Sequence, residues 1–405
     1  MQKHLLLIAT LDTKGREAEY VNECAKGLDA HTTLMDVGIL GTPQTHPDIT
    51  RYELAEAAGY DLNQFIAKRD RSAAVRAVQE GGALVAQRFL REGKLNGVFG
   101  MGGGTGTAIV TSIMRSLPLG LPKVVVSTVA SRDIREYIGT KDIVMFHSVA
   151  DILGLNEFMC HILRQAVHAV CGMMHAGDAI KKGKPMVGVT AYGINSACAL
   201  YAEPLLEKRG YEMIGFHANG VGGMAMEEMI EQGLLVGVLD FTSHELADEM
   251  YGGYCRGIGP ERFETAVKMG IPILLAPGGL DNAVFSPFYP MPESLKGRRQ
   301  HVHDIRFCVR MEGEEMIKFA RIIADRLNKH RGPAHMLIPM KGWSEADKAG
   351  MVLFGPHANR IFVEELKKVL RPDVSVEEMD VHISDPPFAE RAVEILDGMI
   401  RTKKA

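Results

Sequence analysis

Short apolar runs alternate with segments of helical periodicity along almost the whole chain of 405 residues. The clearest apolar run is Lys123–Ser127, in which three consecutive valines follow Pro122. The clearest helical segment is Arg71–Arg91, in which apolar residues recur at intervals of three and four. Strands that alternate with helices form βαβ units, and the strands of such units pair in parallel. The sequence therefore predicts an α/β fold whose sheets are mainly parallel and doubly wound.

The same two patterns predict further elements in both halves of the chain. Strands are expected at Leu5–Thr10, Thr32–Val37, Gly97–Gly100, Ile143–His147, Met186–Thr190, Glu212–Phe216, Leu235–Leu239, Ile271–Ala276, His335–Pro339 and Val374–Asp380. Helices are expected at Lys14–Leu28, Thr107–Leu117, Leu155–Lys182, Ser196–Lys208, Gly222–Gln232, Glu314–Asn328 and His357–Leu370. The segment Pro277–His303 shows neither pattern and is predicted to be irregular, as functional loops often are.

One of these helices, Leu155–Lys182, ends in a stop signal. Basic residues in its last turn are followed by Gly183 and, after Lys184, by Pro185, and this order is typical of a helix end. The alternation of strands and helices then starts again. We therefore predict two α/β domains, residues 1–184 and residues 185–405.

The composition limits the partners and the compartment. The net charge is −4, with 46 basic and 50 acidic residues, and no block of basic residues indicates a nucleic-acid partner. The apolar run after Met1 is too short for a signal peptide, and no sustained apolar stretch has the length of a membrane-spanning helix. Six scattered cysteines without a CxxC pair are typical of reduced thiols. We expect a cytoplasmic protein that binds neither nucleic acid nor a membrane.

The sharpest local feature is a glycine-rich turn between a predicted strand and a predicted helix. Five glycines fall within the seven residues from Gly100 to Gly106. Glycines let successive backbone N–H groups point to one place, where the start of a helix adds partial positive charge. The turn lacks the Gly-Lys-[Ser/Thr] of a P-loop, and a tight turn without a ligand is the alternative. Because three consecutive glycines exceed what a turn needs, we predict a phosphate-binding loop made of Gly102, Gly103, Gly104, Thr105, Gly106 and Thr107.

Other polar residues follow strands that would end at the same edge of this sheet, where doubly wound sheets bind ligands. Lys14 is suited to neutralise a phosphate, and Asp12 to hold a metal ion or a hydroxyl group; a helix cap beside a solvated lysine is the alternative. Asp36 ends the next strand, near the position of the acid that binds ribose hydroxyls in dinucleotide-binding folds. The nucleotide-binding candidates of this group are Asp12, Thr13, Lys14, Asp36, Ser127 and Thr128.

Polar residues with neighbouring glycines also follow several predicted strands of the second half, where they would converge on an active site. His217 is suited to act as a general acid or base with Asp281 as its partner, and His303 is a further catalytic candidate. A capping or surface role is the alternative for each single histidine. The sequence holds no HExxH motif, GxSxG motif or cysteine-nucleophile signature, so we predict neither a metal site nor a covalent nucleophile.

Six motifs spread over nearly the whole chain occur in the order of a known family. They are Ala9-Thr10-Leu11-Asp12-Thr13-Lys14-Gly15, Gly102-Gly103-Gly104-Thr105-Gly106-Thr107, Phe216-His217-Ala218-Asn219-Gly220-Val221-Gly222-Gly223, Leu239-Asp240-Phe241-Thr242, Pro277-Gly278-Gly279-Leu280-Asp281 and His382-Ile383-Ser384-Asp385-Pro386. With these motifs the chain resembles the ATP-binding family of the tomato mosaic virus resistance protein. The resemblance implies two Rossmann-like domains, ATP bound by the first of them, and a homodimer. It implies nucleotide contacts at Lys14 and the glycine loop, with Thr128 nearby.

The resemblance also implies what is missing from this chain. In the plant protein a TIM-barrel-like module follows the region that the six motifs cover. We expect that module to be absent here or separately encoded, which argues against an antiviral role for this chain.

Three functions are compatible with these features. The first is an enzyme that binds ATP, alone or with Mg²⁺, on the glycine loop and a small carbon metabolite in the cleft between the domains. The second is a regulator that senses ATP and binds a protein partner without catalysis. The third is a nucleotide-independent isomerase, lyase or hydrolase whose phosphorylated substrate occupies the glycine loop. We expect the first, because the polar loops of the second half outnumber what partner binding needs.

Overall fold

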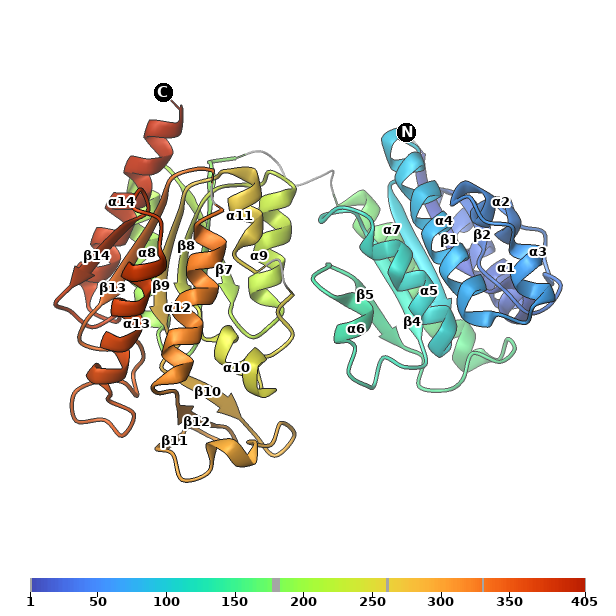
Figure 1. The fold of residues 1–405 in the computed structure, drawn as a ribbon. Helices are drawn as coiled ribbons and strands as arrows, with labels where there is room; N and C mark the ends of the chain where they lie inside the picture. The colour runs from blue at the N-terminus through green and yellow to red at the C-terminus, as the bar shows by residue number, and fades with distance from the viewer. Residues whose placement is uncertain (1, 177–182, 260–261, 330, 405) are drawn as a thin grey trace. The chain divides into compact units, whose positions relative to one another are not determined.

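The computed structural model describes residues 2–176, 183–259, 262–329 and 331–404. The chain divides into two compact units, Met1–Lys181 and Lys182–Ala405. Figure 1 shows that each unit has a central sheet with helices on both of its faces. All strand pairs of the two large sheets are parallel. The predicted α/β fold with two Rossmann-like parallel sheets is thus confirmed.

The N-terminal unit has a five-stranded sheet in the order β2-β1-β3-β4-β5. The strands are β1 (Lys3–Ala9), β2 (Ala30–Asp36), β3 (Gly97–Gly102), β4 (Lys123–Ser127) and β5 (Val144–His147). The helices are α1 (Leu11–Gly27), α2 (Arg51–Ala57), α3 (Leu62–Ala67), α4 (Arg71–Arg91), α5 (Gly104–Arg115), α6 (Arg135–Ile138) and α7 (Glu157–His175). The strand order reverses between β1 and β3, and such a switch point is where ligands of open parallel sheets bind.

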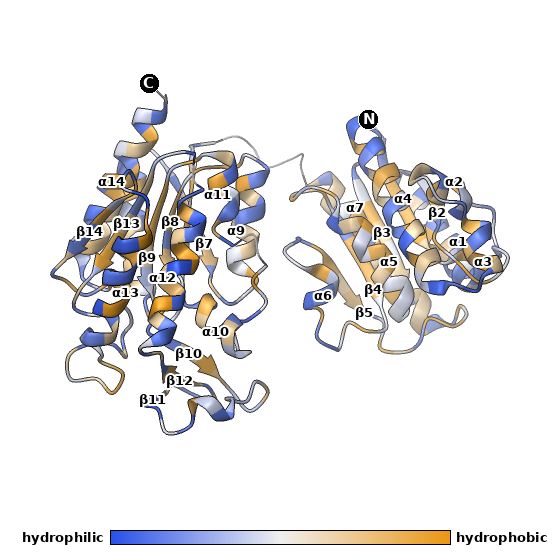
Figure 2. Cartoon of the chain, viewed as in Figure 1, coloured by the Kyte–Doolittle hydropathy of each residue, from blue (hydrophilic) through white to orange (hydrophobic). Residues whose placement is uncertain are grey.

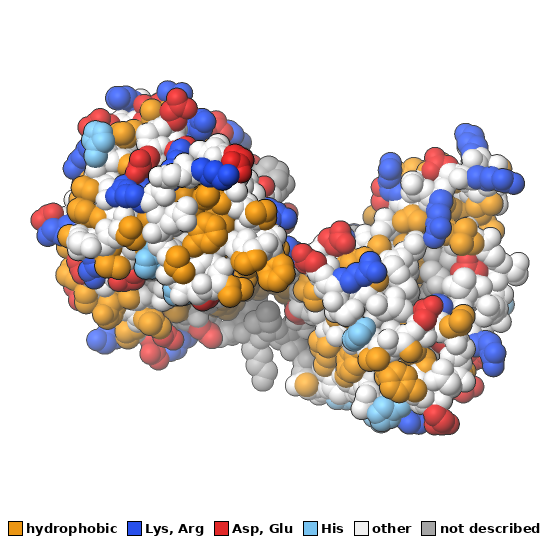
Figure 3. All heavy atoms as spheres, turned by 90° about the horizontal axis from the view of Figure 1, so that it is seen from below, with side chains coloured by type: hydrophobic (Ala, Val, Ile, Leu, Met, Phe, Trp, Pro, Cys, Tyr) orange, Lys and Arg blue, Asp and Glu red, His pale blue; other side chains and the backbone are white. Residues whose placement is uncertain are grey.

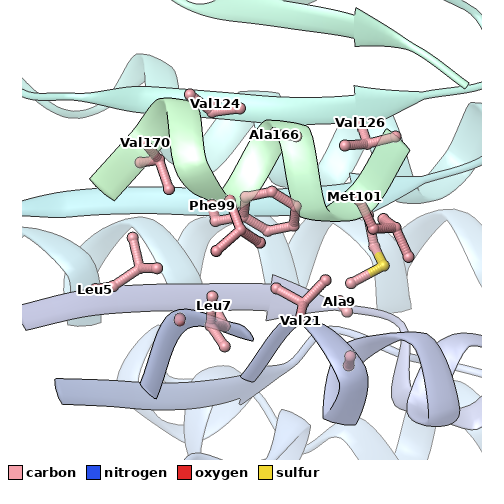
Figure 4. Packing of buried hydrophobic residues seen from close by; sticks show 14 of the residues in the cluster. Leu5, Leu7, Ala9, Val21, Phe99, Met101, Val124, Val126, Ala166 and Val170 are labelled. Atoms are coloured by element: carbon pink, nitrogen blue, oxygen red, sulfur yellow. The ribbon is translucent and has the colours of Figure 1, made fainter. Parts of the chain in front are cut away.

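Two apolar layers hold this sheet between its helices. Phe99 of β3 is fully buried among α1 and α7 residues such as Val21 and Val170, as Figure 4 shows. Val98, its neighbour along β3, points to the other face and packs with residues of α4 and α5. Successive side chains of a strand face opposite sides, so a strand covered on both faces reads as a continuous apolar run. Figure 2 shows this contrast, with apolar strands between helices that carry both colours.

The C-terminal unit repeats this topology with one more strand. Its strands are β6 (Met186–Ala191), β7 (Glu212–His217), β8 (Leu235–Thr242), β9 (Ile273–Gly278), β13 (Ala334–Pro339) and β14 (Ser375–Met379). Their order is β14-β13-β9-β8-β6-β7, which is the N-terminal order read from the other edge, with β14 added. The switch point of this sheet therefore lies between β6 and β8.

Seven helices of the described residues cover the second sheet. They are α8 (Ser196–Lys208), α9 (Gly222–Glu231), α10 (Glu245–Tyr251), α11 (Glu264–Met269), α12 (Glu314–Leu327), α13 (Pro356–Val369) and α14 (Pro386–Lys404). On one face α8 and α14 pack together over β6, β8 and β9. Here Phe388 and Leu396 of α14 lie in one core cluster with Leu206 of α8.

One expectation about the elements is corrected, and one lies partly outside the described residues. The segment predicted to be irregular, Pro277–His303, contains β10 (Asn282–Phe285), the 3₁₀ helix η1 (Glu293–Leu295) and β11 (Gln300–Val302). With β12 (Phe307–Arg310) these strands form a small antiparallel sheet in the order β10-β12-β11. Strands of three or four residues are too short for their periodicity to be read. The helix predicted to reach Lys182 is described to His175, and its predicted end lies outside the described residues.

None of the helices in the described part of the chain has the length and apolar character needed to cross a membrane. Figure 3 shows Lys and Arg side chains interspersed with Asp and Glu on the face it presents. Charges of both signs are therefore mixed on that face, in agreement with the small net charge of −4.

We predict that Leu6→Ala destabilises the N-terminal unit by about 2–5 kcal/mol, since a fully buried leucine of β1 leaves a cavity when truncated. The same change at Leu153, which is 76% exposed, should alter stability by less than about 0.5 kcal/mol. Urea unfolding followed by circular dichroism measures both. Equal losses for the two variants would contradict the described packing.

Candidate functional site

The glycine loop lies at the switch point of the first sheet. A side chain at Gly102 would bring its Cβ within 2.7 Å of the Gly106 backbone, so the tight turn requires glycine there. Gly106 in turn packs beside Thr10, which follows β1. A Cβ at Gly104 would meet no atom of the described residues within 4 Å. The loop is thus closed on its inner side and open on its outer side.

The first turn of α5 carries free donors toward that open side. Among the described side chains none caps this helix, whose N-cap residue is Gly103. The first N–H groups of a helix have no partner within the helix, and they concentrate partial positive charge at its start. Thr128 lies beside the loop, with its hydroxyl oxygen 3.8 Å from the Cβ position of Gly103. Gly104 and Thr105 are exposed, so an anion can reach this turn.

Two of the predicted contact residues shape the loop from within. The Thr107 hydroxyl donates to the Gly102 carbonyl oxygen at 3.1 Å and lies 2.8 Å from the Ser127 hydroxyl. The Ser127 oxygen also accepts the N–H of Val129. Both side chains are fully buried, so Thr107 and Ser127 join the ends of β3 and β4 beneath the loop.

The residues after β1 are partly engaged by their own chain. The Asp12 carboxylate accepts the N–H groups of Leu40 and Gly41 at 2.9 and 3.0 Å. The Thr13 hydroxyl lies 3.0 Å from that of Thr10, and the Lys14 ammonium group donates to the carbonyl oxygen of Ile152. Asp12 therefore anchors the chain after β2, which reduces its capacity for a metal ion.

Asp36 at the end of β2 is buried and fully engaged. It accepts the N–H groups of Leu11 and Gly38, and the guanidinium group of Arg51 donates to it at 2.7 Å. These bonds use both carboxylate oxygens. Asp36 therefore links the ends of β1 and β2 from inside, and its oxygens are not available to ribose hydroxyls.

The sequence analysis missed a cation and an apolar cavity next to the glycine loop. Arg71, the first residue of α4, donates to the Thr105 hydroxyl at 3.2 Å. It also lines a cavity of about 380 Å³ with Leu40, Phe65 and Ile66. These residues lie on separate loops and helices, so no local sequence pattern connects them with the glycine motif. A flat apolar group beside a phosphate would fit between them.

A second cavity, of about 220 Å³, opens at the switch point of the second sheet. It is lined by Tyr192, Gly193, Ile194, His217, Val284, His303, Arg306 and Cys308. Tyr192 directly follows β6, and its ring stacks on that of His217, the last residue of β7, at 5.1 Å. His217 and His303, both predicted as catalytic, are thus brought together, whereas Tyr192, Arg306 and Cys308 were missed.

The electrostatics of this cavity suit proton transfer near an anion. Burial, helped by the positive charges of His244 and Arg306, lowers the pKa of His217 below its ordinary value. Its imidazole is therefore neutral at neutral pH and can accept a proton. Burial and the nearby carboxylate of Asp281 raise the pKa of the Cys308 thiol to about 12, so Cys308 stays a neutral thiol. Arg306, braced by Asp304 at 2.6 Å, supplies positive charge.

Asp281, the predicted partner of His217, lies near Cys308 but does not line this cavity. Its carboxylate accepts the Asn282 amide at 2.9 Å and the Ser344 hydroxyl at 2.8 Å, and it is fully buried. The guanidinium group of Arg310 lies 3.8 Å away and also binds Asp347 at 3.1 Å. Asp281 is not among the residues that line the His217 cavity. The side-chain contacts of Asp281 are thus with Asn282, Ser344 and Arg310, and the ring contact of His217 is with Tyr192.

A buried arginine fixes the loops around this cavity. The Arg262 guanidinium group lies 2.5 Å from the carboxylate of Asp240 in β8 and 2.9 Å from that of Glu245 in α10. Glu245 also accepts the N–H of Gly220, in the loop after β7. All three charged side chains are buried. Arg262 thus connects the segments that follow β7 and β8 with the sheet.

Comparison with known proteins shows similarity over the full length of both units. The model of the uncharacterised protein family UPF0261 matches with its N-terminal domain at residues 3–179 and with its C-terminal domain at residues 184–400. A UPF0261 protein of Clostridium tetani is 38% identical over 403 residues, which cover 99% of this chain and 100% of that protein. A UPF0261 protein of Rhizobium meliloti is 36% identical over 96% of this chain and 98% of its own length.

A plant protein matches as well. The ToMV resistance protein Tm-1(GCR237) of Solanum lycopersicum is 38% identical over 312 residues, which cover 75% of this chain. The matched region is 41% of the tomato protein's length. The greater part of that protein therefore has no counterpart in this comparison.

We predict that Arg262→Met destabilises the C-terminal unit by about 3–5 kcal/mol, because it leaves the buried carboxylates of Asp240 and Glu245 without their cation. The control is Arg321→Met, which breaks a pair with Glu365 at a side chain that is 66% exposed. That change should cost no more than about 1 kcal/mol. Denaturant unfolding of both variants measures these free energies. An Arg262→Met protein as stable as the wild type would show that the ion pairs of Arg262 are dispensable.

Proposed function

This chain belongs to the uncharacterised protein family UPF0261, and we propose that it is an ATP-binding enzyme that acts on a small anionic metabolite. The observation that carries the nucleotide part is the uncapped, exposed first turn of α5 at the switch point of the first sheet. Oriented N–H groups and the helix dipole at such a place bind phosphate. Thr105, Thr128 and Arg71 lie around the same turn.

The cavity beside Arg71 supports a position for the nucleotide base in this proposal. Phosphates on the first turn of α5 would bring the base toward Leu40, Phe65 and Ile66, whose side chains are apolar. Mg²⁺ keeps several waters and usually binds through substrate phosphates. Since the Oδ2 atom of Asp12 already accepts two N–H groups, we propose that Mg²⁺ enters with ATP and is held mainly by it.

The chemical step belongs to the second unit in this proposal. Its cavity combines a neutral imidazole at His217, a phenol at Tyr192 and a guanidinium group at Arg306. A base beside a cation fits a metabolite that carries a carboxylate or a phosphate and loses a proton during reaction. We also propose that the protein is a homodimer and that it is cytoplasmic. Sedimentation of the purified chain measures its oligomeric state.

We predict that ATP with Mg²⁺ raises the unfolding temperature of the wild type by roughly 5–10 °C at about 100 times its Kd, where binding adds about 2.7 kcal/mol. Gly104→Val should abolish this shift, because the valine side chain would occupy the open side of the loop, where an added Cβ meets no described atom within 4 Å. The matched control is Gly172→Val, an exposed site in α7 where a Cβ also meets nothing. It should keep the full shift.

The unfolding temperatures with different ligands, together with the function of a His217 variant, separate the alternative functions. A shift with sugar phosphates but with no nucleotide would overturn the ATP proposal and favour a phosphorylated substrate on the loop. An ATP shift that persists in Gly104→Val would place the nucleotide elsewhere. An ATP shift together with full cellular function of a His217→Asn variant would favour a regulator without catalysis.

A further inference from the structure

Three potential metal ligands meet behind the cavity of the second unit. His244 is the N-cap of α10, Asp248 lies one turn later on the same helix, and Cys255 belongs to the loop that follows. One ligand atom from each lies within 4.8 Å of the others. All three side chains are fully buried. In that location a histidine, a carboxylate and a thiol need either internal partners or an ion.

The hydrogen bonds of His244 leave one ring nitrogen for such an ion. Its Nε2 atom lies 2.6 Å from the carbonyl oxygen of Ala218. A proton on Nε2 leaves Nδ1 as the ring nitrogen that a metal ion can bind in place of a second proton. A backbone carbonyl that fixes the ring in this way is the usual outer partner of a metal-binding histidine. Tyr192 stacks on the other side of the ring, with 4.3 Å between the ring centres.

One oxygen of the Asp248 carboxylate is likewise engaged by the protein, and the other is left for an ion. Its Oδ1 atom accepts the N–H groups of Cys255 and Val284 at 3.3 and 3.1 Å. Its Oδ2 atom and the Nδ1 atom of His244 have no hydrogen-bond partner among the described residues. These two atoms are 3.1 Å apart, the distance of an ion pair with a protonated His244. A metal ion bound between them would take the place of that proton.

The spacing suits a small ion between the two atoms. Ligands about 2.0–2.1 Å from a tetrahedral ion are about 3.3 Å from each other. The donor set also selects the ion: nitrogen and sulfur ligands favour Zn²⁺, whereas Mg²⁺ and Ca²⁺ require oxygen. Two glycines permit this packing. A Cβ at Gly253 would collide with the Asp248 carboxylate, and one at Gly279 would lie 2.8 Å from the Cβ of His244.

We propose that His244 Nδ1, Asp248 Oδ2 and Cys255 Sγ form a site for Zn²⁺ next to Tyr192, whose ring lines the second unit's cavity. Three protein ligands are the number found in catalytic zinc sites, and they leave one position for water or substrate. Cys308, which lines the cavity and shares a packing cluster with Cys255, lies outside this ligand set. The site contains no residue of the glycine loop. Whether the chain binds Zn²⁺ is therefore independent of whether it binds ATP.

The test is the metal content and the cobalt spectrum of the full chain. After chelation and dialysis, the wild type should take up about one Zn²⁺ per chain. Titration with Co²⁺ should produce the near-ultraviolet band of a cobalt–thiolate bond. Cys255→Ser and Asp248→Asn should lose stoichiometric binding, and Cys255→Ser should also lose the band. The matched control is Cys198→Ser, another fully buried cysteine that lies in the apolar core between α8 and the sheet.

Each outcome bears on the proposal. Retention of metal and band by Cys198→Ser and by Cys308→Ser supports a three-ligand site with an open position. Loss of both in Cys308→Ser would overturn the open position, since Cys308 would then be a fourth ligand. A wild type that binds no Zn²⁺ and gives no cobalt–thiolate band overturns the site itself. This last measurement needs no variant, so it holds even where Cys255→Ser fails to fold.

Discussion

Every strand of the two large sheets runs in the same direction, and this constraint determines where the chain can place its functional groups. Parallel strands require a crossover connection, so the loops that follow all strands gather at one edge of each sheet. In both units the first strand is flanked by the second and third, which creates one point where neighbouring loops diverge. The glycine loop lies at this point in the first unit, and Tyr192 and His244 lie there in the second.

Buried arginines connect distant segments in both units. Arg51 binds Asp36 at the end of β2, Arg262 binds Asp240 in β8, and Arg310 binds Asp347 at 3.1 Å. The planar guanidinium group presents several donors in fixed directions, so one arginine can fix loops that are distant in sequence. Such networks hold ligand-binding groups in place before a ligand arrives, which lowers the entropy lost on binding.

The sequence was sufficient to predict most of the α/β framework, because strands covered on both faces are apolar and the helices between them are amphipathic. Lys123–Ser127, Arg71–Arg91 and Ser196–Lys208 coincide with β4, α4 and α8. The helix α14 was missed, although Pro386 and Pro387 mark its first turn, where proline is tolerated. The short strands β10, β11 and β12 lie in or next to a segment without readable periodicity.

The sites were less predictable, since they depend on contacts between distant segments. The glycine loop is local and was recognisable from its own residues. Arg71 is 34 residues from Thr105, and its contact with that hydroxyl arises only from the packing of α4. His217 and Asp281 were paired because both follow strands, but burial directs Asp281 toward Ser344. His244 and Asp248 are four residues apart, a spacing that many surface helices share. Only the burial of both side chains, which the sequence does not show, indicates a metal site.

The packing of α14 on α8 has a consequence for how the protein is made. The first helix of the second unit, α8, packs against the last helix, α14. The core cluster that contains Leu206 and Leu396 can therefore form only after α14 has been synthesised. The first unit contains all of its own strands and can fold while the second is still being synthesised. Until α14 emerges from the ribosome, the part of the apolar surface of α8 that packs on α14 stays exposed. Premature termination shortly before Pro386 would therefore produce a chain with one folded unit and one prone to aggregation.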